Sequence, residues 1–77
     1  MNKNMLVSKM KLFGDNQENL AVALDLSLTR TNAKINNTDG AEFTQDEIRT
    51  IMNRYDLTPE EVVQIFLIEN DTVKGIW

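Results

Sequence analysis

The stretch that decides the fold is residues 17–36, QENLAVALDLSLTRTNAKIN, in which two short helical patterns meet around a three-residue connection. Leu20, Ala21 and Leu24 share one face of the first pattern, and Ala21 is small where another helix would approach closely. Ser27 is a good N-cap for a second helix that runs through Lys34. Two helices joined this tightly are typical of a helix-turn-helix, which presents its second helix to the DNA major groove.

The inner side of this unit is predicted from its apolar spacing. Leu26 is expected to point inward from the turn, and Leu28, Thr31 and Ile35 follow at i, i+3 and i+7. We therefore expect the second helix to pack on the core through these three positions.

Length and composition limit the classes of protein to consider. A chain of 77 residues is expected to form one domain with a small core, which a dimer contact would help to stabilise. It contains no cysteine and no histidine, which removes thiolate metal sites and the usual general base. The polar run 37–40 does not form a calcium loop, because Ile35 stands at the first ligand position. We expect no enzyme activity, no metal, no cofactor and no small-molecule substrate.

The first fourteen residues, MNKNMLVSKMKLFG, have a basic start but no long apolar run. This pattern predicts neither a signal peptide nor a membrane span. A cytoplasmic protein is the expectation.

The net charge of −4 is unevenly distributed along the chain. Residues 1–37 carry five cations and three anions, a net charge of +2, whereas residues 38–77 carry three cations and nine anions, a net charge of −6. This polarity would orient the molecule on a phosphate backbone, although the attraction is small.

The flanking segments predict further helices. Residues 3–13 place Leu6, Met10 and Phe13 on one face, and Gly14 is the expected stop. Asp15 or Asn16 can cap the helix that follows. Residues 37–40 read as a loop.

Two capping boxes predict the last helices. Thr44 with Glu47 precedes an apolar stripe formed by Ile48, Ile51, Met52 and Tyr55. Thr58 with Glu61 repeats the device, with Pro59 at the first helical position, and predicts a fifth helix that runs through the apolar residues 62–68. The expected domain spans residues 1–69, and residues 70–77 form a tail.

The second helix of the 17–36 stretch carries side chains suited to reading DNA. Arginine pairs with guanine and asparagine with adenine, while threonine and alanine methyl groups meet thymine. Lys34 and Gln17 are expected to contact phosphates. The alternative is that Arg30 and Lys34 only solvate an exposed face. The candidate DNA-binding residues are Gln17, Ser27, Thr29, Arg30, Asn32, Ala33, Lys34 and Asn36.

Large apolar residues cluster late in the chain, at Phe66, Leu67, Ile68, Ile76 and Trp77. They exceed what a five-helix core of this size needs. We therefore expect Phe66, Leu67, Ile68 and Trp77 to contribute to a partner or self-association surface.

Two segments, SKMKLFGDNQENLAVALDLSLTRTNAKIN and EFTQDEIRTIMNRYDLTPEEVVQIF, resemble small Cro-like and repressor-like helix-turn-helix proteins of temperate phages of Gram-positive bacteria. The similarity runs over residues 5–67. Ala21, Ser27 and the ending Lys34-Ile35-Asn36 match the family pattern. The chain departs from it at Asp25, where the family carries glycine, and at Thr31, where it carries a large apolar residue.

The resemblance implies an all-α, five-helix domain of the lambda-repressor-like type that acts in a lysis/lysogeny switch in the cytoplasm of a bacterial host cell. Operator DNA, bound by a homodimer, is the first expected partner. The alternative is a modulator of repression that binds the cognate phage repressor rather than DNA, which the acidic net charge and the two departures favour. The residues expected to meet the repressor's basic surface are then Glu42, Asp46 and Glu47.

Overall fold

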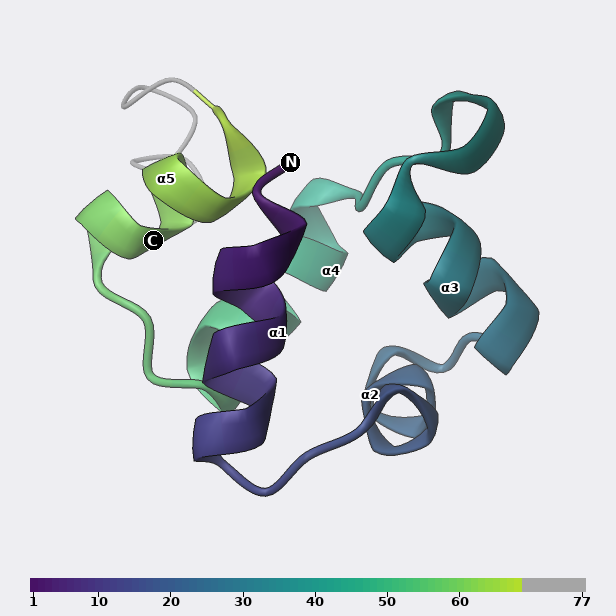
Figure 1. The fold of residues 1–77 in the computed structure, drawn as a ribbon, viewed down its shortest axis with the longest axis horizontal. Coiled ribbons are helices and arrows are strands. Elements are labelled where there is room, and N and C mark those ends of the chain that lie inside the picture. The colour runs from purple at the N-terminus through teal and green to yellow at the C-terminus, as the bar shows by residue number, and fades with distance from the viewer. Residues whose placement is uncertain (69–77) are drawn as a thin grey trace.

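The computed structural model describes residues 1–68, which form five α-helices and one short 3₁₀ turn and contain no strand (Figure 1). The all-helical prediction is confirmed for this part of the chain. The expected boundary at residue 69 and the tail 70–77 lie outside the described residues. The elements are α1 (Lys3–Leu12), α2 (Gln17–Leu24), α3 (Leu28–Asn36), η1 (Thr38–Gly40), α4 (Gln45–Arg54) and α5 (Pro59–Phe66).

The helices form two groups around α1. Figure 1 shows α5 on one side of α1 and the α2–α3 pair on the other, with α4 behind α1. Contacts join α1 to α5, α2 to α3 and α2 to α4. Within the described residues, no helix is long and apolar enough to cross a membrane.

Every helix contributes side chains to one buried core. Most predicted inner positions of α1, α2 and α4 are buried, Leu24 of α2 is partly buried, and Tyr55 and Leu57 complete the core beside α5. Two predicted inner positions are wrong. Leu28 is 41% exposed and Phe13 is 50% exposed, although the Phe13 ring packs edge-on against Tyr55. The buried apolar residues are Leu6, Met10, Leu20, Ala21, Ile35, Ile48, Ile51, Met52, Tyr55, Leu57, Val62 and Ile65.

Helix starts follow the capping signals. Both predicted boxes are present: Thr44 and Glu47 bond reciprocally at the start of α4, as do Thr58 and Glu61 at the start of α5. Of the two candidate caps for α2, Asn16 is used, because its Oδ1 accepts a hydrogen bond from the Asn19 N–H at 2.8 Å.

The ends of α2 and α5 adopt left-handed backbone without glycine. Asp25 (φ 55°) ends α2, and Leu67 (φ 55°) ends α5. The helical backbone therefore stops at Phe66, so the prediction that it continues to Ile68 is wrong. No glycine stands at position 67 to predict the end of the helix, and leucine is strained at a positive φ.

Each capping-box glutamate also binds a lysine from a different helix. Glu61 in α5 pairs with Lys9 of α1, and Glu47 in α4 pairs with Lys34 of α3. A local helix-start signal therefore also joins two helices in each case.

Asp15 ties the α1–α2 connection to the end of α4. Its carboxylate accepts two hydrogen bonds from Arg54, at 2.7 and 3.0 Å, and one from the Tyr55 hydroxyl at 2.5 Å. The Arg54 hydrogen bond outweighs burial and lowers the pKa of Asp15 to about 2. Burial, followed by the bond to Asp15, raises the pKa of Tyr55.

Candidate nucleic-acid interface

The α2–α3 pair is held by bonds within its three-residue connection. The Leu26 N–H donates to the Ala21 carbonyl at 2.9 Å, closing the end of α2. Ser27 then caps α3, because its Oγ accepts from the Arg30 N–H at 3.1 Å. The direction in which α3 leaves α2 is therefore fixed by the backbone of the turn and by one hydroxyl.

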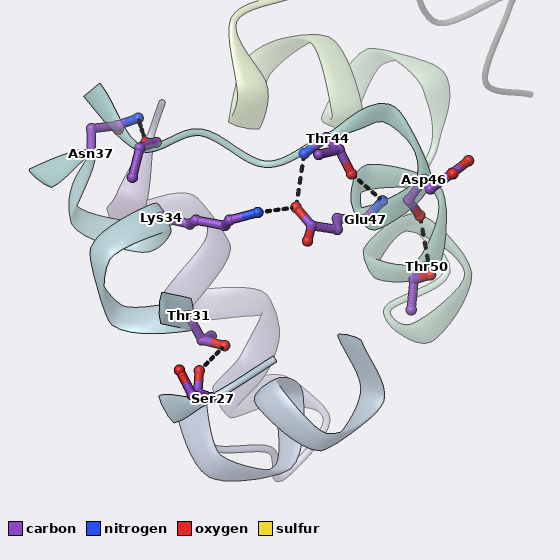
Figure 2. Close-up of polar contacts among 9 residues, drawn as sticks. Ser27, Thr31, Lys34, Asn37, Thr44, Asp46, Glu47 and Thr50 are labelled. Atoms are coloured by element: carbon purple, nitrogen blue, oxygen red, sulfur yellow. Dashed lines mark hydrogen bonds and ion pairs between the residues drawn. The ribbon is translucent and has the colours of Figure 1, made fainter. Parts of the chain in front are cut away.

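The inner face of α3 carries Thr31, Lys34 and Ile35, all buried. The Thr31 hydroxyl donates to the Ser27 carbonyl at 3.0 Å, so this polar group is satisfied inside the fold (Figure 2). Thr31 therefore occupies a core position without leaving an unpaired donor.

The outer face of α3 carries the remaining candidate residues of that helix. Thr29, Ala33 and Asn36 recur at i, i+4 and i+7 and so share one side. Thr29, Arg30 and Asn36 are exposed, while Asn32 and Ala33 are half-buried. The Arg30 guanidinium makes no ion pair or side-chain hydrogen bond with the described residues.

The start of α2 lies beside this face. Gln17, which is half-buried, shares a shallow hollow with Leu28 and Asn32 of α3. Glu18 lines the same hollow and is exposed. The structure thus brings the candidate residues Gln17 and Asn32 together and places the Glu18 carboxylate next to them.

Lys34, which was predicted to contact a phosphate, is turned away from the outer face and is buried in the fold. Its ammonium lies 2.5 Å from Glu47 Oε1, with only 9% of the Lys34 side chain and 13% of the Glu47 side chain exposed (Figure 2). Burial opposes ionisation of Glu47, yet the Lys34 hydrogen bond and the Thr44 N–H keep its pKa below the usual value. Helical spacing could have predicted that Lys34 lies on the inner face, because it follows Thr31 by three residues and precedes Ile35, and both of these residues were predicted to face the core.

The three carboxylates predicted to meet a partner differ in availability. Glu42 is exposed, and Asp46 is exposed but lies 3.2 Å from the Arg49 guanidinium. Glu47, the third predicted partner contact, completes the α4 capping box and pairs with Lys34.

The predicted apolar partner surface is only partly free. Phe66 packs edge-on against Phe43, with ring centroids 6.0 Å apart, and Ile68 packs on the core. Leu67 is 69% exposed beside a hollow lined in part by Met1 and Phe43. Trp77 lies outside the described residues.

One contact beside α3 was not foreseen from the sequence. The Lys3 ammonium, from the first turn of α1, donates to Asn36 Oδ1 at 2.5 Å. The two residues are 33 positions apart, so no local pattern announces the contact.

The described residues contain no group of three acidic side chains arranged to hold a metal ion. What the α2–α3 surface offers is a short helix with amide, hydroxyl and guanidinium groups on its outer side. Comparison with protein-family models, with curated proteins and with solved structures finds no match to the chain.

Proposed function

We propose that the chain is a phage-type transcriptional regulator that binds operator DNA through α3, with α2 and α3 acting as a helix-turn-helix. The observation that carries the proposal is the division of α3 into two faces. Thr31, Lys34 and Ile35 hold the helix from within, while Thr29, Arg30 and Asn36 project from the other side. A helix anchored in this way can enter the major groove without losing core contacts.

The outer side chains match what base edges offer. Arg30 can bond to O6 and N7 of guanine, and Asn32 can bond to N6 and N7 of adenine. The methyl groups of Thr29 and Ala33 can contact thymine. Gln17 and Ser27, at the starts of α2 and α3, would contact the DNA backbone on either side of the groove.

The electrostatic contribution to this binding is small. Lys34 is neutralised by Glu47, which leaves Arg30 as the exposed cation carried by α3 itself. Because each neutralised phosphate contributes about 0.9 to the salt slope of the binding constant, we expect a shallow slope. Specific binding must then come mainly from base contacts and from two copies on a two-fold operator.

Replacement of Arg30 tests the proposal. The operator candidate is the intergenic DNA beside the gene that encodes this protein. Its binding, measured by fluorescence anisotropy, should be weaker by about 1–3 kcal/mol for Arg30→Ala than for the unaltered chain. Lys11→Ala removes the same charge from an exposed position near the end of α1 and should leave specific binding nearly unchanged. Equal affinity of the unaltered chain for operator and scrambled DNA would overturn the proposal.

The second candidate function is capture of the cognate repressor protein. The observation that favours it is the charge beside α3, where Glu18 lines the hollow with Asn32, Asp25 is exposed in the turn, and Lys34 is withdrawn. These carboxylates repel phosphate but suit the arginine and lysine side chains of a DNA-binding protein.

Mixing with the repressor in the absence of DNA distinguishes the two functions. Capture predicts a complex that weakens with salt and that Glu18→Lys disrupts. Glu60→Lys makes the same charge change at an exposed position of α5 and should leave that complex intact. If no complex forms at micromolar concentration, this second function is excluded.

A further inference from the structure

Lys3 lies at the edge of the outer face of α3. Its ammonium donates to Asn36 Oδ1 at 2.5 Å, and both residues are exposed. Figure 1 shows the start of α1, in purple, near the end of α3 that precedes the η1 loop. Asn36 follows Thr29 and Ala33 at i+7 and i+3, so the Lys3 charge reaches the side of α3 that faces outward.

The backbone around Lys3 is fixed to the rest of the fold. The Asn2 N–H donates to the Ile65 carbonyl of α5 at 2.6 Å, and Asn2 Oδ1 accepts from the Met5 N–H at 3.2 Å. Met1 and Met5 pack on the core. The position of Lys3 relative to α3 is therefore set by the fold.

The charge of Lys3 is not neutralised within the described residues. Of the seven lysines and arginines in residues 1–68, four form ion pairs with carboxylates: Lys9, Lys34, Arg49 and Arg54. The remaining three are Lys3, Lys11 and Arg30. Only Lys3 and Arg30 adjoin α3, and the partner of Lys3 is a neutral amide oxygen.

We propose that Lys3 holds a backbone phosphate of the bound nucleic acid beside the last turn of α3, the role that the sequence assigned to Lys34. The inference rests on the proposed DNA-binding function and deepens it. Arg30 and Asn36 are six residues apart, about 9 Å along the helix axis, so Lys3 and Arg30 bracket the outer face. A lysine ammonium gains more from a charged phosphate than from a neutral amide, so DNA can displace Asn36 as its partner.

Lys3→Gln and its matched control Lys11→Gln test this assignment. Lys11 stands eight residues later in the same helix, about 12 Å along its axis. The measurement is fluorescence anisotropy of an operator duplex and a scrambled duplex over a series of salt concentrations. Lys3→Gln should weaken both duplexes by the same factor and reduce the salt slope by about 0.9, whereas Lys11→Gln should leave the slope unchanged.

Lys3→Arg, which keeps the charge, should bind DNA with the same salt slope as the unaltered chain. Circular dichroism would verify that all three variants are folded. The assignment is overturned if the unaltered chain binds its operator and Lys3→Gln binds with the same affinity and slope. It is also overturned if Lys11→Gln lowers the slope equally. Failure of the unaltered chain to bind any duplex would instead overturn the proposed function itself.

Discussion

The Lys34–Glu47 pair gives the sharpest prediction, because it decides whether Lys34 serves the fold or a ligand. In Glu47→Ala, two groups lose their acceptor. The Thr44 N–H, 2.9 Å from Glu47 Oε1, loses its half of the capping box, and the Lys34 ammonium is left in a largely buried position.

The cost follows from these two losses. A lost backbone hydrogen bond contributes about 1 kcal/mol. Removing one partner of a buried ion pair costs about 3–5 kcal/mol when burial is complete. Because both side chains retain some exposure and lysine can extend toward water, we expect Glu47→Ala to cost about 2–4 kcal/mol in total.

Glu61→Ala is the matched control. Glu61 fills the same capping position in α5 and pairs with Lys9, but those side chains are 24% (Lys9) and 22% (Glu61) exposed. Its removal should cost about 1–2 kcal/mol, the sum of a cap and a partly solvated ion pair. Urea unfolding followed by circular dichroism at 222 nm measures both values.

A double variant keeps the prediction testable if Glu47→Ala fails to fold. Gln can still accept the Thr44 N–H, and Met fills the space of the Lys34 stem, so Lys34→Met with Glu47→Gln should recover most of the lost stability. If Glu47→Ala costs no more than Glu61→Ala, then Lys34 is not held by the fold. It would then be available to phosphate after all.

Three further predictions follow from single positions. Because Asp15 has a pKa of about 2 when folded against 3.8 when unpaired, it stabilises the fold by about 2 kcal/mol above pH 4, and this is lost as the pH falls toward 2. Asp15→Asn should remove that pH dependence in acid titrations of urea-induced unfolding, and an unaltered profile would contradict the role of Arg54. Asp25→Gly should raise the free energy of unfolding by about 0.5–1 kcal/mol, because glycine adopts φ 55° without strain. Asp25→Asn, which removes the charge alone, is the control. An unchanged urea midpoint in Asp25→Gly would refute this prediction. Leu67→Ser should shift sedimentation toward monomer without loss of core packing, whereas a protein that is already monomeric at high micromolar concentration would exclude self-association through this residue.

Helix starts could be predicted from the sequence because their causes are local. Thr44 and Glu47, like Thr58 and Glu61, are three residues apart and satisfy each other's backbone at the helix start. The end of α5 could not be predicted in the same way, because Leu67 takes a left-handed conformation that its side chain does not favour.

The candidate site was predicted only in outline. The identity of the outer face of α3 follows from helical spacing, and Thr29, Arg30 and Asn36 are exposed as a reading helix requires. The charges around it depend on contacts between distant residues. Lys34 and its partner Glu47 are 13 residues apart in the sequence, and Lys3 and its partner Asn36 are 33 residues apart. Neither contact can be predicted from local spacing, so the sequence alone does not show which of the two lysines is free to bind phosphate.

The most direct test of the central proposal is a salt series of operator binding by the full chain and by Arg30→Ala, with scrambled DNA as the reference. We predict specific binding with a salt slope of about −1 per protomer, from the phosphate contact of Lys3, and a roughly 5- to 150-fold loss of affinity on removal of Arg30. Equal affinity for both duplexes at every salt concentration, together with a DNA-free complex with the repressor, would contradict operator binding and establish capture of the repressor in its place.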